Sequence, residues 1–96
     1  MAKPPTIEVS SAELEAIFQV LDMWSKINDG HLTTAPIPGK TRPSWNYPAG
    51  VSEILRHENT TGYHVATTHR ITSPDGSIPH WDARDLHIGD TVIWVE

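Results

Sequence analysis

The chain has 96 residues, 12 acidic against 7 basic side chains, and no cysteine. This length fits one domain of ordinary size, and the lack of cysteine excludes disulfides and thiolate metal sites. The formal charge of −5 argues against a nucleic-acid partner, because phosphate binding requires a basic surface.

Residues 1–96 are therefore expected to form a single domain. No apolar run approaches the ~18 residues that a membrane-spanning helix needs. The N-terminal segment 1–5 lacks the apolar region of a signal peptide, and Met1 indicates a standalone gene product. These features predict a soluble cytoplasmic protein without a membrane partner.

Residues 1–9 are expected to form an N-terminal arm. The adjacent Pro4 and Pro5 exclude a helix there, although residues 6–9 could pair as a short strand.

A long amphipathic helix is predicted from Ser11 to Asn28. Ser10 and Glu13 have the spacing of a capping box, in which each side chain binds the other residue's backbone amide. Apolar side chains then recur at helical spacing: Leu14, Ile17, Phe18, Leu21 and Trp24. Residues 28–30, Asn-Asp-Gly, supply a left-handed stop.

Residues 31–50 are expected to form a proline-rich loop. Four prolines and two glycines exclude a regular helix and leave at most short edge strands. Trp45 and Tyr47 interrupt this segment. Either they pin the loop onto the body of the protein, or they form the wall of a pocket or an anchor at an interface.

The remaining residues are expected to form most of a sheet. Residues 51–57 fit either a short helix or a strand, and the sequence does not decide between them. A period of two then predicts strands over 63–71 and 77–82, with further strands at 86–88 and 91–95. The fold class expected is α+β, with one N-terminal amphipathic helix packed on a small antiparallel sheet of three to five strands.

The hairpin around Pro74-Asp75-Gly76 fixes which side chains meet. A three-residue loop ending in a left-handed glycine places Arg70 opposite His80 and Thr68 opposite Asp82, with Trp81 turned to the core. One fact opposes this register: Pro79 would stand in a hydrogen-bonded pair without an N–H to give. A two-residue loop would avoid that conflict.

The preferred register gathers His80, Asp82 and Arg70 into one polar group. A histidine beside a carboxylate can act as a general base, and an arginine can hold a phosphate in a bidentate manner. These three residues are the candidate catalytic set if the protein is an enzyme. His64 and Thr68 share the same predicted face and, with Trp45 and Tyr47, are the candidate residues for binding a ligand or a partner. The simpler interpretation is that this face is merely solvated.

Neither a metal site nor a cofactor is predicted. His64 and His69 are five residues apart, which places them on opposite faces of a regular strand. No zinc-protease helix, EF-hand loop, phosphate-binding loop or nucleophile-elbow motif occurs.

The six histidines make the charge of the protein sensitive to pH. If Asp82 or Asp85 pairs with histidines, their folded pKa values rise and mildly acidic pH favours folding. Histidines buried in the neutral form have the opposite effect.

The sequence identifies no family. Residues 75–78 resemble the C-terminal pattern of small phage anti-defence proteins that sequester cyclic nucleotide signals, together with Trp81, Asp85-Leu86, Asp90 and Trp94. Residues 42–46, which follow the predicted helix and its stop at Gly30, resemble their N-terminal half. The spacings from Trp81 onward depart from that pattern. The resemblance implies ligand binding.

These observations lead to three hypotheses about function. The first is a non-enzymatic binding or interaction protein, such as a regulator, an inhibitor or an immunity or antitoxin-like protein, whose partner is another protein or a second copy of this chain. The second is a metal-independent, histidine-dependent nuclease or phosphodiesterase. The third is a binder of a small phosphate-bearing ligand or nucleotide.

Overall fold

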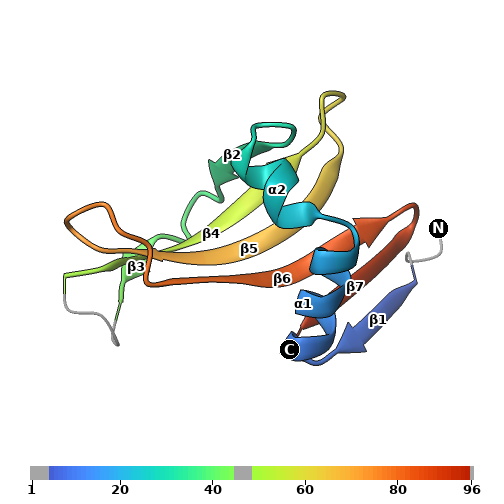
Figure 1. The fold of residues 1–96 in the computed structure, drawn as a ribbon, viewed down its shortest axis with the longest axis horizontal. Helices are drawn as coiled ribbons and strands as arrows, with labels where there is room; N and C mark the ends of the chain where they lie inside the picture. Colours follow the sequence, from blue (N-terminus) through green and yellow to red (C-terminus); the bar gives the residue numbers. More distant parts are fainter. Residues whose placement is uncertain (1–4, 45–48, 96) are drawn as a thin grey trace.

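The computed structural model describes residues 5–44 and 49–95. Within these ranges one sheet has the strand order β1-β7-β6-β5-β4-β2, and β3 also pairs with β4 (Figure 1). The elements in chain order are β1 (Thr6–Val9), α1 (Ser11–Val20), α2 (Met23–Asn28), β2 (Thr33–Pro36), β3 (Arg42–Pro43), β4 (Val51–Glu58), β5 (His64–Thr72), β6 (His80–Ile88) and β7 (Thr91–Val95).

The predicted fold class is wrong in its sheet and in its helix. The described residues form a seven-stranded mixed sheet rather than a small antiparallel one. Short strands in the N-terminal arm and in the proline-rich segment enlarge it at both edges, where prolines such as Pro36 and Pro43 are tolerated. The sheet is mixed because β1 runs parallel to β7, with Thr6 beside Val92 and Val9 beside Val95.

The predicted continuous helix is divided into α1 and α2. Its capping box is confirmed, because Ser10 and Glu13 exchange both hydrogen bonds. The break occurs at Asp22, which has a left-handed backbone with φ of 56°. Aspartate tolerates this conformation better than most residues do. The break redirects the chain, so that Trp24 packs against Trp81 of the twisted sheet. Neither helix in the described ranges is long and apolar enough to cross a membrane.

Both helices pack on the same side of the sheet (Figure 1). We call this side the covered face and the other side the open face. The buried apolar cluster joins side chains of both helices and of the sheet: Leu14, Phe18, Met23, Ile27, Leu32, Ala66, Ala83 and Leu86. Partly buried Trp81 packs against it, so the predicted inward orientation of this indole is confirmed.

The undecided segment 51–57 is strand, and it lies beside β5 in the middle of the sheet. The predicted register of the next hairpin is wrong by one residue. The loop closes as predicted, with the Ser73 amide bonded to the Ser77 carbonyl. Beyond Pro79, however, Ile71 pairs with His80 and Arg70 with Trp81. Because Pro79 has no N–H for the ladder, the pairing resumes after it with one residue inserted.

Two β-bulges change the alternation of side chains along the central strands. One lies between β4 and β5, where Val65 is the extra residue between the pairs of His64 and Ala66. The other lies between β5 and β6, where Arg84 is the extra residue between Ala83 and Asp85. Each bulge moves the side chains beyond it to the opposite face.

Candidate functional site on the open face

Four of the six histidines lie on the open face. The bulges place His64 and His87 on the same side as His69 and His80. Without them, His64 and His69 would lie on opposite faces, and so would Asp82 and Asp85. With them, the polar side chains form two groups. The first cluster consists of His69, His80 and Asp82, and the second consists of His64, Asp85 and His87.

In the first cluster both histidines contact the same carboxylate oxygen. In His69 the Nδ1 atom lies 3.1 Å from Asp82 Oδ1, and the Nε2 atom lies 2.6 Å from Ser52 Oγ. A single tautomer satisfies both contacts, with Nδ1–H donating to the carboxylate and Nε2 accepting the hydroxyl proton. His80 Nε2 lies 2.9 Å from the same Asp82 oxygen. A hydroxyl, an imidazole and a carboxylate are thus arranged as nucleophile, base and orienting group.

A basic pocket opens beside this cluster. Its volume is about 300 Å³, and the residues that line it are Lys40, Arg42, Ser52, Ile54, His69 and Arg84. Arg42 is paired with Ser52 across β3 and β4, so both side chains are on the open face. Among the described residues no carboxylate lies within ion-pair distance of Lys40 or Arg42, and Arg84 approaches Asp82 only to 4.0 Å. Three cations therefore converge on this pocket in an acidic protein.

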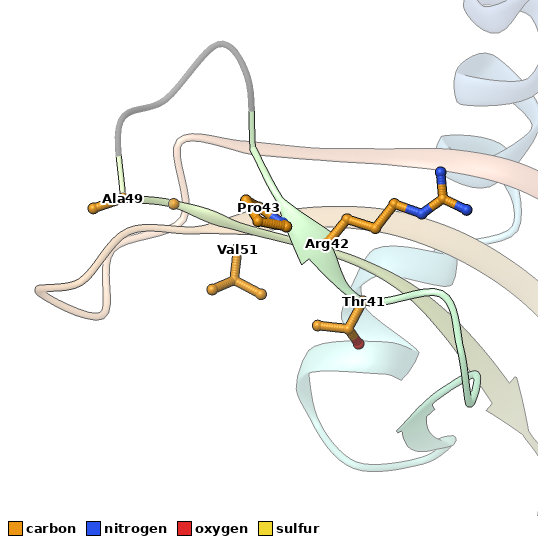
Figure 2. A pocket seen from close by; sticks show the side chains of 6 residues that line it. Thr41, Arg42, Pro43, Ala49 and Val51 are labelled. Atoms are coloured by element: carbon orange, nitrogen blue, oxygen red, sulfur yellow. The ribbon is translucent and has the colours of Figure 1, made fainter.

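A second pocket on the other side of the β3–β4 pair is apolar. It is lined by Thr41, Arg42, Pro43, Ala49, Gly50 and Val51, with a volume of about 390 Å³. Figure 2 shows the Arg42 guanidinium extending away from Ala49 and Val51. The backbone of Arg42 thus borders this apolar pocket, whereas its charged guanidinium belongs to the basic pocket.

The second cluster is less completely bonded. The rings of His64 and His87 stack with their centroids 4.2 Å apart. Asp85 Oδ1 lies 3.2 Å from His87 Nε2 and 3.9 Å from His64 Nε2. That oxygen is buried, and it accepts no hydrogen bond within the described ranges. Burial and the neighbouring His87 lower the pKa of His64 below its ordinary value. Two imidazoles and a carboxylate could hold a metal ion here or in the first cluster.

The predicted catalytic set is not assembled. His80 and Asp82 lie together on the open face, as predicted, but Arg70 lies opposite Trp81 on the covered face. Its guanidinium forms an ion pair with Glu53 at 3.2 Å and lies over the Trp81 ring. The one-residue shift at Pro79 is the cause, because it exchanges the β5 residues that face His80 and Asp82.

Thr68, a predicted binding residue, is fully buried on the covered face. Its hydroxyl accepts the Trp81 Nε1 proton at 2.9 Å and lies 2.7 Å from His57 Nε2. The other nitrogen of His57 lies 2.9 Å from the Thr34 hydroxyl. Burial lowers the pKa of His57 to about 4, so this imidazole is neutral at physiological pH. The network joins β2, β4, β5 and β6, and Thr68 is used within it rather than exposed to a ligand.

The other predicted binding residues have different outcomes. His64 belongs to the second cluster, whereas Trp45 and Tyr47 lie outside the described residues. Sequence reasoning missed Ser52, and its register placed Thr68 rather than His69 opposite Asp82. Pro79 was the available signal for the register, but nothing in the sequence marks Arg84 as a bulge.

Comparison with known proteins adds no relative. The chain matches no protein-family model, and neither curated proteins nor solved structures give a significant match.

Proposed function

We propose that the protein binds a small phosphate-bearing ligand in the basic pocket. The observation that carries this proposal is the convergence of Lys40, Arg42 and Arg84 around His69 and the Ser52 hydroxyl. Of the three hypotheses drawn from the sequence, the proposal follows the third, a binder of a small phosphate-bearing ligand, rather than the first, in which the partner is a protein.

The charges of the pocket support an anionic ligand. Like charges that face one another repel, and Lys40 and Arg42 have no carboxylate partner among the described residues to offset this repulsion. A bound phosphate would neutralise them and accept charge-assisted hydrogen bonds from both guanidinium groups.

The extent of the pocket favours a small molecule over a nucleic-acid strand. Its volume of about 300 Å³ is at the lower end of the roughly 300–1,000 Å³ typical of ligand sites. Long nucleic acids need many phosphate contacts along a basic surface. Here three cations line one pocket of a chain whose formal charge is −5.

Calorimetry and thermal shift with inorganic phosphate, pyrophosphate and a set of linear and cyclic nucleotides test this proposal. The variants Arg42→Ala and Arg84→Ala should weaken binding by about tenfold or more, because each removes a charge-assisted hydrogen bond worth roughly 1.5–3 kcal/mol. Arg56→Ala is the matched control, because Arg56 is also on the open face but is paired with Glu58 at 2.7 Å. The proposal fails if no probe binds the parent protein, or if Arg56→Ala weakens binding as much as the pocket variants.

Hydrolysis of a phosphate ester is a second candidate function. The arrangement of Ser52, His69 and Asp82 supports it, because the hydroxyl–imidazole contact of 2.6 Å is within proton-transfer range. Ser52 Oγ would attack phosphorus while its proton moves to His69 Nε2. The leaving alkoxide would take that proton, and water would then hydrolyse the phosphoserine. Arg42 and Arg84 would stabilise the negative charge of the transition state.

Release of nitrophenolate from bis(4-nitrophenyl) phosphate and 4-nitrophenyl phosphate separates the two candidates. If the protein is a hydrolase, Ser52→Ala and His69→Ala should each reduce kcat by at least about a hundredfold. His87→Ala is the matched histidine control and should retain activity. Parent protein that binds phosphate without turnover would support the binding function alone.

A further inference from the structure

We propose that the second cluster, formed by His64, Asp85 and His87, is a binding site for one divalent transition-metal ion of the zinc class. The site is separate from the basic pocket and involves none of the residues that line it. The inference therefore does not depend on the proposed function.

The ligand atoms are already close to the spacing that such an ion requires. Zinc binds imidazole nitrogen and carboxylate oxygen at about 2.0–2.2 Å, so two ligands of a tetrahedral site are roughly 3.4 Å apart. Asp85 Oδ1 lies 3.2 Å from the Nε2 atom of His87 and 3.9 Å from that of His64. All three ligand atoms lie within 4.8 Å of one another, so the distances to His64 must shorten for one ion to reach the whole set.

The buried Oδ1 atom of Asp85 has no hydrogen-bond partner among the described residues. His87 Nε2 lies 3.2 Å from it, yet this contact does not have the geometry of a hydrogen bond. Two atoms that ligate one metal ion show this relation, because the nitrogen lone pair points at the ion, to one side of the N···O line. An unpartnered buried carboxylate oxygen is costly, and a cation in the space between these atoms would remove that cost.

The surroundings strengthen the attraction for a cation. Across the sheet, Asp85 is paired with Trp94 and His87 with Val92. Directly paired side chains have Cβ atoms about 4.5–5.5 Å apart, so apolar groups border the cluster. Their low polarity reduces competition from water. A carboxylate and two neutral imidazoles carry one negative charge, which suits a divalent ion.

The two histidines contribute unequally. His64 Nε2 lies 2.8 Å from Thr67 Oγ1 and 3.0 Å from the Ala66 carbonyl oxygen, so without metal it donates its proton there. Ligation through this atom requires the tautomer with the proton on Nδ1 and gives up these contacts. We therefore expect Asp85 and His87 to dominate affinity, with a smaller contribution from His64.

The same argument favours the second cluster over the first. In the first cluster, Asp82 Oδ1 has contacts with both histidines, and His69 is also bonded to Ser52. Metal binding there would break the hydrogen bonds of Asp82 Oδ1. In the second cluster it would give up the contacts of His64 Nε2 but would supply the partner that Asp85 Oδ1 lacks among the described residues.

The donor set also indicates which ions bind. Two imidazoles select zinc, cobalt, nickel or copper over magnesium and calcium, which prefer all-oxygen sites. Three protein ligands leave one tetrahedral position for water or another molecule.

Titration of the full chain with Co²⁺ and Zn²⁺ tests the site. Co²⁺ absorption reports the coordination geometry, and displacement by Zn²⁺ with calorimetry gives stoichiometry and affinity. We expect one ion per chain, with a tetrahedral Co²⁺ spectrum. Asp85→Asn and His87→Ala should each weaken Zn²⁺ binding by at least about tenfold, and His64→Ala by less. His80→Ala, from the first cluster, should leave affinity unchanged.

Circular dichroism of each variant shows whether it is folded. Asp85→Asn keeps the shape of the side chain, so it tests the charge of the ligand without opening a cavity. The inference is overturned if the parent protein binds neither ion more tightly than Asp85→Asn does. It is also overturned if His80→Ala abolishes binding, because the ion would then belong to the first cluster.

Discussion

The covered and open faces belong to the same strands, but the histidines on the two faces have opposite surroundings. On the covered face, His57 is completely buried and lies between two threonine hydroxyls. On the open face, the half-buried histidines lie against carboxylates, as His69 does against Asp82 and His87 against Asp85. Burial lowers the pKa of His57 and keeps this imidazole uncharged at physiological pH, whereas the open-face imidazoles and carboxylates are placed to share a metal ion.

The difference indicates where stability and chemistry are located. The covered face has apolar contacts and a closed hydrogen-bond network, so its residues hold the helices and strands together. The open face has a hydroxyl–imidazole–carboxylate arrangement and, among the described residues, Lys40 and Arg42 without a carboxylate partner and an Asp85 oxygen without a hydrogen bond. Substitutions on the two faces should therefore separate folding from binding.

The largest expected effect is on the covered face. Phe18 is fully buried against Trp24, so Phe18→Ala should lower the free energy of unfolding by about 3–5 kcal/mol. His80→Ala on the open face should change it by no more than about 0.5 kcal/mol. Urea denaturation monitored by tryptophan fluorescence gives both values. Equal losses would show that the open face also holds the fold together.

Acidification should destabilise the protein through His57. Its folded pKa of about 4 lies below its ordinary value of 6.5, so the unfolded chain takes up the proton first. The stabilisation is fully present above pH 6.5 and is lost as the pH falls through this window towards 4. The loss is on the order of 3 kcal/mol over the whole interval.

Urea denaturation between pH 7 and pH 5 measures this slope, and His57→Gln is the variant to compare. Glutamine keeps a polar side chain but cannot titrate, so stability of the variant should depend less on pH. If the parent and the variant have parallel pH profiles, His57 is not the group responsible. Carboxylates shared by both proteins cancel in the comparison.

The smallest expected effect is at the break between α1 and α2, which lets the two helices follow the sheet. Asp22 has φ of 56°, and alanine in this left-handed conformation costs about 1 kcal/mol. Asp22→Ala should therefore lower the free energy of unfolding by roughly that amount, whereas Asp22→Asn should leave it nearly unchanged. A stabilising effect of alanine would mean that the two helices fuse into one in solution.

Much of the local structure could be predicted from the sequence, because short-range signals determine it. Ser10 and Glu13 define the start of α1, and the alternation after residue 63 defines β5. The sheet edges could not be predicted in the same way. The pairing of β1 with β7 joins the two ends of the described chain, and no local pattern specifies such a partner.

The candidate site was only partly predictable. His80 and Asp82 were correctly grouped, but Arg70 was assigned to the wrong face, because register depends on a single residue near Pro79. Ser52 lies in a segment that fitted either helix or strand, so its contact with His69 could not be anticipated.

The bulge at Arg84 makes the spacing between Asp82 and Asp85 matter as much as their identity. Deleting this one residue would restore regular alternation, turning Asp85 and His87 towards the helices and Leu86 out into water. Removing one residue here would thus turn every following side chain of β6 to the opposite face of the sheet. A protein that keeps both clusters must therefore keep two residues between Asp82 and Asp85, even if the amino acid at position 84 differs.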